Sequence, residues 1–326
     1  MTWVLSGRGE SCAVRVTNSE YAMTAPSPAP AKLHGWLNID KPLGMSSGQV
    51  VAACKRILRP IMPKGWKIGH GGTLDPLATG VLPIALGEAT KLTGYILDAT
   101  KGYDFTLRFG EARSTDDGEG EVITTSDVIP DEAAIAAVLP RFLGEIDQVP
   151  PIYSALKVDG ERAYALARAG EHVELQSRRV TIHKLELVSM GEREVSFSCL
   201  CSKGTYIRSL ARDIARALGT VGYVSVLRRT KAGPFELQTS ILLDNLETLV
   251  QEQQPEQAFL PVTAGLDDIP ALAVTPREAL LLRQGQRLDG SSLRPGTYMA
   301  MDGQTPVAIV EAVEGQVRVL RGLNLI

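Results

Sequence analysis

Hydrophobic and polar residues recur with two different periods along this chain of 326 residues, and the two periods predict its strands and its helices. The two classes alternate with period two over residues 180–188 and 194–201, as in strands with one buried face. Residues 35–40 and 103–109 also predict strands. Residues 114–120, rich in Asp and Gly, predict a loop after the second of these.

The predicted helices follow a period close to 3.6 residues. A serine at position 46 or 47 caps the first helix, and Pro60 ends it. One face of this helix collects apolar side chains, namely Val50, Val51, Cys54, Ile57 and Leu58. Residues 131–142 and 160–169 predict two further helices.

The clearest helical pattern covers residues 206–218 and stops at Gly219. Its apolar stripe consists of Ile207, Leu210, Ala211, Ile214 and Leu218. Arg208, Arg212 and Arg216 follow at intervals of four along the flank of this stripe. We therefore expect one edge of the helix to present three guanidinium groups together.

The order of these elements lacks the regular alternation of strand and helix that builds a parallel sheet. It predicts an α+β fold with a central mixed, largely antiparallel sheet flanked by helices. Residues 1–31, with alternating prolines, predict a disordered tail, and residues 32–240 a main domain. Residues 241–268 are a connecting segment, and the turn-rich residues 269–326 predict a small β-rich domain.

The charges of the chain are segregated. The net charge of −3 alone argues against a protein that binds nucleic acid. However, residues 41–67 contain six basic and no acidic residues, and residues 200–235 contain seven basic residues against one acid. Residues 111–147 reverse the balance, with ten acids against two basic residues. This segregation predicts a basic face on an acidic protein, and we expect that face to contact RNA.

The cysteine pattern predicts neither a disulfide nor a metal site. None of the four cysteines forms a Cys-x-x-Cys pair, and no Cys/His cluster has zinc spacing. Cys199 and Cys201 lie two apart on a predicted strand, so we expect both thiols to be buried on one face. No apolar run approaches the ~18 residues of a membrane span, and no signal pattern opens the chain. We expect a cytoplasmic protein.

Residues 69–80 read Gly-His-Gly-Gly-Thr-Leu-Asp-Pro-Leu-Ala-Thr-Gly and contain one carboxylate, that of Asp75. Pro76 disfavours helical backbone at Asp75, because its ring clashes with a helical preceding residue. The glycines allow the backbone to approach a ligand closely. The segment therefore predicts a carboxylate held on a stiff extended backbone, as a catalytic group requires. Taken alone, it also fits an ordinary Gly-rich surface turn.

Further motifs accompany this stretch, which continues to Lys91. They are Lys-Pro-Leu-Gly-Met-Ser-Ser at 41–47, Lys-Gly-Tyr at 101–103, Gln-Val-Pro-Pro-Ile-Tyr-Ser-Ala-Leu-Lys-Val-Asp-Gly at 148–160, Ser-Lys-Gly-Thr-Tyr-Ile-Arg at 202–208 and Leu-Arg-Arg at 227–229. In this order, they resemble the motifs of TruB-type tRNA pseudouridine synthases over about residues 33–235. One loop departs from the family: Arg113-Ser114 replaces its first Thr-Asp, so we assign that loop no detailed role.

The resemblance implies the pseudouridine synthase fold for the main domain and a PUA-like fold for the C-terminal one. It implies conversion of uridine to pseudouridine without cofactor or metal, with Asp75 as the catalytic group. Asp75 could attack C1′, add to uracil C6 or remove the C2′ proton, and the sequence does not choose among these. Lys41 and Pro42 are expected to support the catalytic loop.

The resemblance also assigns roles to five other residues. Arg208 is expected to pair with Asp75, holding its rotamer and keeping its pKa low. Tyr103 is expected to stack on the target uracil, and Leu227 either lines the uracil pocket or belongs to the core. Tyr206 is a candidate for late removal of the C5 proton. His70 is expected to contact RNA around the flipped nucleotide.

The implied partner is tRNA, with uridine 55 of the T-loop as the target. No DNA, membrane or obligate protein partner is implied, and we expect a monomer. Three alternatives remain: a tRNA-folding factor with incidental activity, a guide-RNA-dependent enzyme of the same superfamily, and a sugar-processing enzyme. The last would need a second catalytic carboxylate, which the sequence does not place near Asp75.

Overall fold

The computed structural model describes residues 33–154, 157–158, 161–162, 175–266, 269–289 and 292–325. The tail predicted over residues 1–31 lies outside these ranges, as does most of the helix predicted over residues 160–169. The described part of that helix is instead strand β9 (Glu161–Arg162), which pairs with β8 (Lys157–Val158), so the helix prediction is wrong there.

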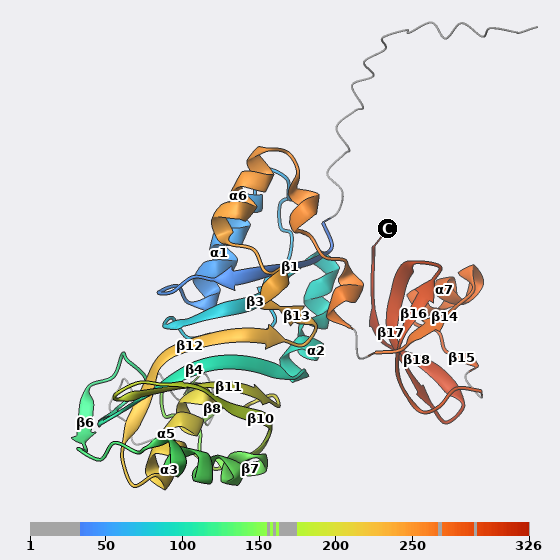
Figure 1. The fold of residues 1–326 in the computed structure, drawn as a ribbon. Helices are drawn as coiled ribbons and strands as arrows, with labels where there is room; N and C mark the ends of the chain where they lie inside the picture. Colours follow the sequence, from blue (N-terminus) through green and yellow to red (C-terminus); the bar gives the residue numbers. More distant parts are fainter. Residues whose placement is uncertain are drawn as a thin grey trace, which may run out of the picture. The chain divides into compact units, whose positions relative to one another are not determined.

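One large mixed sheet has the strand order β1-β3-β12-β4-β11-β10-β7 (Figure 1). Its strands are β1 (Gly35–Lys41), β3 (Ala78–Leu86), β12 (Gly222–Ala232), β4 (Lys101–Phe109), β11 (Glu194–Cys201), β10 (Arg178–Met190) and β7 (Gly144–Gln148). The short strands β2 (Ile68–His70) and β13 (Phe235–Glu236) pair with β3 and β12. Among the described strands of this sheet, only the β3–β12 pair is parallel, which confirms the mixed, largely antiparallel prediction.

The described helices are α1 (Ser47–Leu58), α2 (Thr93–Asp98), α3 (Glu132–Val138), α5 (Ile207–Ala217), α6 (Leu243–Gln251) and α7 (Pro276–Arg283). The 3₁₀ turns are Gly87–Leu92, Leu139–Phe142, Leu237–Thr239, Pro255–Ala258 and Val262–Gly265. The helix predicted over residues 131–142 is α3 followed by a 3₁₀ turn with Pro140 in its first turn. Among the described residues, no helix is long and apolar enough to cross a membrane.

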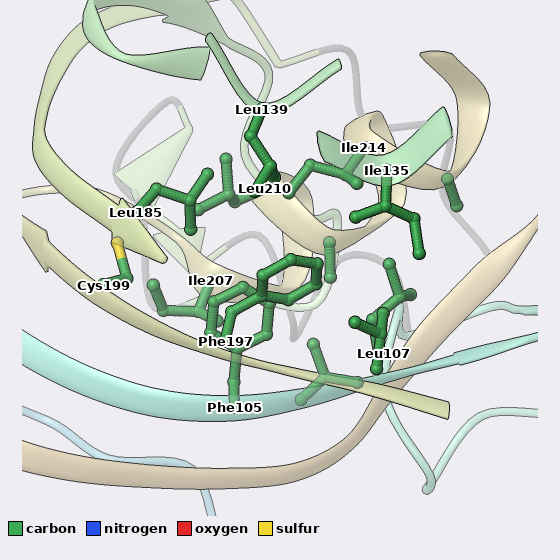
Figure 2. Close-up of a cluster of buried hydrophobic side chains, with 14 of the residues drawn as sticks. Phe105, Leu107, Ile135, Leu139, Leu185, Phe197, Cys199, Ile207, Leu210 and Ile214 are labelled. Carbon is green, nitrogen blue, oxygen red and sulfur yellow. The ribbon is translucent and has the colours of Figure 1, made fainter. Parts of the chain in front are cut away.

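Helix α5 packs its predicted apolar stripe against one face of the sheet (Figure 2). Ile207, Leu210 and Ile214 are buried there in one cluster with Phe105 of β4 and Phe197 of β11. The two phenylalanine rings lie 5.2 Å apart between their centres. This packing fixes the start of α5 above β4 and β12, where the candidate site lies.

Helix α1 begins as predicted, with Ser46 as its cap. The Ser46 side chain accepts from the backbone N–H of Gln49, and the Gln49 side chain accepts from Ser46 N, which forms a capping box. The apolar face of α1 packs with β1, β3 and α6 in a second cluster. The segment predicted to connect domains thus contains a helix, and its Leu246 is fully buried in that cluster.

The C-terminal part forms a separate sheet with the strand order β14-β16-β17-β18-β15. Its strands are β14 (Ala271–Ala273), β16 (Gly296–Asp302), β17 (Thr305–Val313), β18 (Gln316–Gly322) and β15 (Leu288–Asp289). Glu314 and Gly315 both have positive φ, as a two-residue hairpin turn requires. A last hairpin, β5 (Glu111–Arg113) with β6 (Val122–Thr125), flanks the loop at residues 114–121. The predicted α+β class and β-rich C-terminal part are confirmed.

Burial of the α5 stripe predicts a large loss of stability on truncation. Ile214 is fully buried, so Ile214→Ala should lower the free energy of unfolding by roughly 2–5 kcal/mol. The exposed Arg216 on the same helix provides the control, and Arg216→Ala should change it by about 0.5 kcal/mol or less. Urea unfolding followed by circular dichroism measures both values. Equal losses in the two variants would contradict this packing.

Candidate active site

A cavity of about 310 Å³ lies where the loop before β3, strands β4 and β12 and the start of α5 meet. Five predicted site residues line it, namely Asp75, Tyr103, Tyr206, Arg208 and Leu227. His70 does not line this cavity, but it lines an adjoining hollow that shares Asp75 and Arg208 with it. The fold therefore brings together residues that the sequence distributes over strands β2, β4 and β12, the loop before β3 and the start of α5.

The backbone of the loop before β3 is fixed on both sides of Asp75. Leu74 N donates to Ser47 Oγ at 2.8 Å, and Ser47 Oγ donates to Leu74 O at 3.1 Å. On the other side, Pro76 O accepts from Lys41 Nζ at 3.2 Å. Lys41 thus contacts the loop that it was predicted to support. These bonds hold Asp75 in place before any ligand arrives, which is the preorganisation that catalysis requires.

Close approach of β3 and β12 depends on Gly80. Its φ is +99°, and a Cβ built there would lie 2.1 Å from the carbonyl oxygen of Arg229. The parallel register pairs Gly80 with Arg229 and Ala78 with Leu227. A side chain at position 80 would separate the strands. Gly80 therefore keeps the Asp75 loop beside the cavity-lining residues of β12.

Two carboxylates share the guanidinium of Arg208. Arg208 Nη2 lies 3.0 Å from Asp75 Oδ2, and Nη1 lies 3.2 Å from Asp117 Oδ2. The same nitrogens donate to Thr115 O and Tyr153 O, each at 2.9 Å. Only 6% of the Arg208 side chain is exposed, against 41% for Asp75. Arg208 therefore anchors one carboxylate oxygen of Asp75 while part of the Asp75 side chain stays accessible.

The pKa of Asp75 does not follow the sequence-based prediction. Arg208 does lie beside it, and its charge lowers the pKa of Asp75, as does that of Lys41. Burial has the largest effect, however, and raises the pKa of Asp75, with a further rise from the nearby Asp117. The net shift is upward, so the prediction of a low pKa was wrong. It considered one ion pair and left out desolvation and the second carboxylate.

The prediction that one edge of α5 presents three guanidiniums together is also wrong, because only one of the three is exposed. Arg208 is buried in its ion pairs, and Arg212 Nη1 lies 2.9 Å from Asp116 Oδ2 and its Nε 3.0 Å from Asp213 Oδ1. Only Arg216 is exposed, 3.9 Å from Asp213. The acidic loop before β6 neutralises the helix edge because it folds directly over it.

Tyr103, Tyr206 and Leu227 line the remainder of the cavity. Tyr103 pairs with Arg229 across β4 and β12, and burial raises the pKa of its phenol. Tyr206 is the residue before α5, and Arg178 stacks on its ring with 5.5 Å between the guanidinium carbon and the ring centre. Burial also raises the pKa of Tyr206. Both phenols are therefore neutral at pH 7.

Sequence reasoning missed three charged residues of the site. Asp117 lies in the loop that was given no role, yet it binds Arg208. Lys101 and Arg229 belong to the recognised motifs and line the cavity, but no function was assigned to them. The alternation of side chains along a strand could have identified two of these three residues. Lys101 lies two positions from Tyr103, and Arg229 two from Leu227, so each faces the same side as a predicted site residue.

His70 ends β2, and its Nδ1 is buried without a hydrogen-bond partner in the described ranges. Burial, and secondly the charge of Arg229, lowers the pKa of His70, so its ring is neutral at pH 7. Among the described residues, no group of three or more His, Cys, Asp and Glu side chains could hold a metal ion.

Two family models match the chain. Residues 55–207 match the N-terminal domain of TruB family pseudouridylate synthases, and residues 208–269 match the C-terminal domain of tRNA pseudouridylate synthase B. The tRNA pseudouridine synthase B of Novosphingobium aromaticivorans is 55% identical, over 89% of this chain and 97% of that protein. The protein of the same name from Zymomonas mobilis is 52% identical, over 92% and 98%.

Solved structures show the same fold. An H/ACA RNP bound to a substrate RNA containing 2′-deoxyuridine contains a chain that superposes with a TM-score of 0.70 at 26% identity, over 90% of this chain and 86% of that one. A chain of a Cbf5-Nop10-Gar1 complex gives a TM-score of 0.70 at 28% identity, over 90% and 85%. With family models, relatives and fold in agreement, this chain belongs to the TruB family of pseudouridylate synthases.

Proposed function

We propose that this chain converts uridine to pseudouridine in tRNA, at position 55 of the T-loop, with Asp75 as its catalytic carboxylate. The observation that carries the proposal is the Asp75–Arg208 ion pair at the wall of the cavity, on a loop fixed from both sides. Relatives at 45–55% identity are named tRNA pseudouridine synthase B, which supports tRNA as the substrate. We also place the activity in the cytoplasm.

The reaction breaks the N1–C1′ bond and joins uracil C5 to C1′. The proton on C5 is lost and N1 gains one, so nothing is consumed and the atoms balance. Asp75 can start this by attacking C1′, by adding to C6 or by removing the C2′ proton. Each route needs the ionised carboxylate, and the partly exposed Asp75 can reach a ligand without leaving Arg208.

The other cavity residues fit contacts with a flipped uridine. Tyr103 offers a ring for stacking, a contact of ~1–3 kcal/mol per base, and Leu227 adds an apolar wall. Tyr206 is a neutral phenol at pH 7, so we assign it contact with the base first. Removal of the C5 proton would require its deprotonated form. His70 lies in the adjoining hollow, where the nucleotides flanking the target would pass.

A basic surface leads away from His70. We call it the basic track and define it as Lys55, Arg56, Arg59, Lys64 and Lys67. His70 lines a hollow together with Lys55, Trp66 and Lys67, and the next hollow contains the other three cations. No acidic residue lines either one. All five cations are exposed, which favours contacts with RNA phosphates.

Loss of the catalytic carboxylate should abolish turnover. Asp75→Asn should slow pseudouridine formation on the order of 10⁴-fold, measured as tritium release from a tRNA transcript labelled with [5-³H]uridine. Asp104→Asn, at an exposed aspartate of β4, should retain the normal rate. A transcript with cytidine at position 55 tests the site of modification.

The assay uses the purified protein alone. Release by wild type without a guide RNA or other proteins would separate this proposal from the guide-dependent alternative. Normal turnover by Asp75→Asn would exclude Asp75 as the catalytic group. If Asp75→Asn still accelerated tRNA folding, a separate folding role would stand beside catalysis.

The raised pKa of Asp75 predicts an acid limb in the rate profile. Below its pKa the carboxyl is protonated and inactive, so kcat/KM should fall on acidification with a midpoint above the ordinary value of about 3.9. The charge of Asp117 contributes to the rise, so Asp117→Asn should move this midpoint to lower pH. Initial rates at tRNA concentrations well below KM, between about pH 4 and pH 8, measure both midpoints. An unchanged midpoint would argue against this coupling.

The basic track predicts salt-dependent binding. The double variant Lys55→Glu/Arg56→Glu should weaken tRNA binding and reduce the slope of log K against log salt by about 1 for each lost phosphate contact. Lys184→Glu is the control, because this exposed lysine of β10 lies outside the track and pairs with Glu186. Filter binding at several salt concentrations provides the slopes. Equal slopes for wild type and the double variant would place the RNA elsewhere.

A further inference from the structure

Two buried cations line the cavity without a carboxylate partner. Lys101 is 6% exposed and Arg229 is 1% exposed. Neither forms a salt bridge within the part of the chain that the structure describes. We call Lys101 and Arg229 the buried cation pair. The charge of Asp98 offsets the burial of Lys101 only in part. Buried charges without a salt bridge are costly in a protein interior, so the presence of two at a ligand cavity calls for a function.

Neutral carbonyl groups satisfy the hydrogen bonds of Arg229. Its Nε donates to Val81 O at 2.7 Å, its Nη1 to Thr73 O at 3.3 Å and its Nη2 to Gly72 O at 3.2 Å. These bonds fix the guanidinium beneath the loop that carries Asp75. They engage one donor of each guanidinium nitrogen and bring no negative charge to offset that of Arg229.

Lys101 is held in the same manner. Its Nζ donates to Ile96 O at 2.7 Å, to Leu97 O at 3.2 Å and to Ala99 O, around the end of α2. Burial, and next the positive charge of Arg229, lowers the pKa of Lys101 to about 8. The two cations therefore lie close enough to repel one another, which raises the cost of keeping both.

The charges around the cavity do not balance. Asp75 and Asp117 are both engaged by Arg208, and these two carboxylates face four cations in all, namely Arg208, Lys41, Lys101 and Arg229. At the rim, Lys203 is matched by Asp98 at 2.9 Å. The part of the cavity wall formed by Lys101, Tyr103 and Arg229 is thus electropositive.

The proposed reaction creates a negative charge at this place. When the N1–C1′ bond breaks, its electron pair stays on uracil and spreads from N1 to O2 and O4. Addition of Asp75 to C6 would also place negative charge on the uracil ring before the bond breaks. Every route left open for Asp75 therefore passes through an anionic base, and preorganised positive charge is the usual means of stabilising such a species.

We propose that the buried cation pair Lys101 and Arg229 stabilises the uracil anion while it is detached from the ribose and turns to present C5. The inference rests on the proposed function. Tyr103 is paired with Arg229 across β4 and β12 and lies two residues from Lys101 on the same strand, so a base stacked on Tyr103 lies within the field of both cations. Arg229 has a second, purely structural reading, as a residue that only positions the Asp75 loop through Gly72 and Thr73.

A change of leaving group distinguishes stabilisation of the uracil anion by Arg229 from a purely structural role of this residue. A transcript with 5-fluorouridine in place of uridine releases a base whose anion fluorine already stabilises, so it depends less on the protein. Arg229→Met should slow single-turnover loss of the target nucleoside about 100-fold with uridine but only about 10-fold with 5-fluorouridine. Arg229→Lys, which keeps the charge, should lose less than Arg229→Met with uridine. Lys101→Met should show the same dependence on the leaving group.

The control is Leu227→Ala, which changes an uncharged cavity residue and should slow both substrates by the same factor. Thermal unfolding identifies variants that do not fold, and Lys101→Met supplies the comparison if Arg229→Met is one of them. Equal factors for both substrates in the charge-removing variants would overturn the inference and leave Arg229 as a positioning residue. Wild type that leaves uridine intact would overturn the proposed function itself, and this inference with it.

Discussion

The ion pairs of Arg208 with Asp75 and Asp117 are the interaction on which the candidate site depends. One guanidinium, almost completely buried, orients the Asp75 carboxylate and fastens the loop at residues 114–121 to the start of α5. Removing either acid would leave a buried charge under-compensated, which is far costlier than losing a surface pair. The position of α5 is fixed in turn by its apolar stripe, so core packing and site geometry depend on each other.

Backbone carbonyls have an unusual role around this ion-pair network. Lys41, Lys101 and Arg229 are buried and donate to carbonyl oxygens of the segments that surround the cavity. Such bonds tie down irregular backbone that no strand or helix ladder satisfies. They also leave positive charge next to the place where the substrate would be bound. Rigidity of the loops and electrostatic character of the cavity therefore come from the same side chains.

Local pattern in the sequence predicts the strands, the α1 cap and the α5 stripe because period and capping depend on neighbouring residues. The family motifs predict which side chains gather at the cavity. The sequence cannot reveal that Asp116 and Asp117 fold over α5, since those contacts join residues about 90 positions apart. The net pKa shift of Asp75 is the sum of opposing effects from burial and from several neighbouring charges. These effects can be compared only when the folded structure is known.

Helix α1 connects two distant parts of the molecule. Its first residue, Ser47, bonds to the backbone beside Asp75, and its last turn carries Lys55 and Arg56 of the basic track. A helix of 12 residues spans about 18 Å and does not stretch. For an RNA strand that is bound at both ends of α1, the helix keeps the two contact points at a fixed distance from each other. The helix length would then set how many nucleotides separate a clamped phosphate from the one base that reaches Asp75.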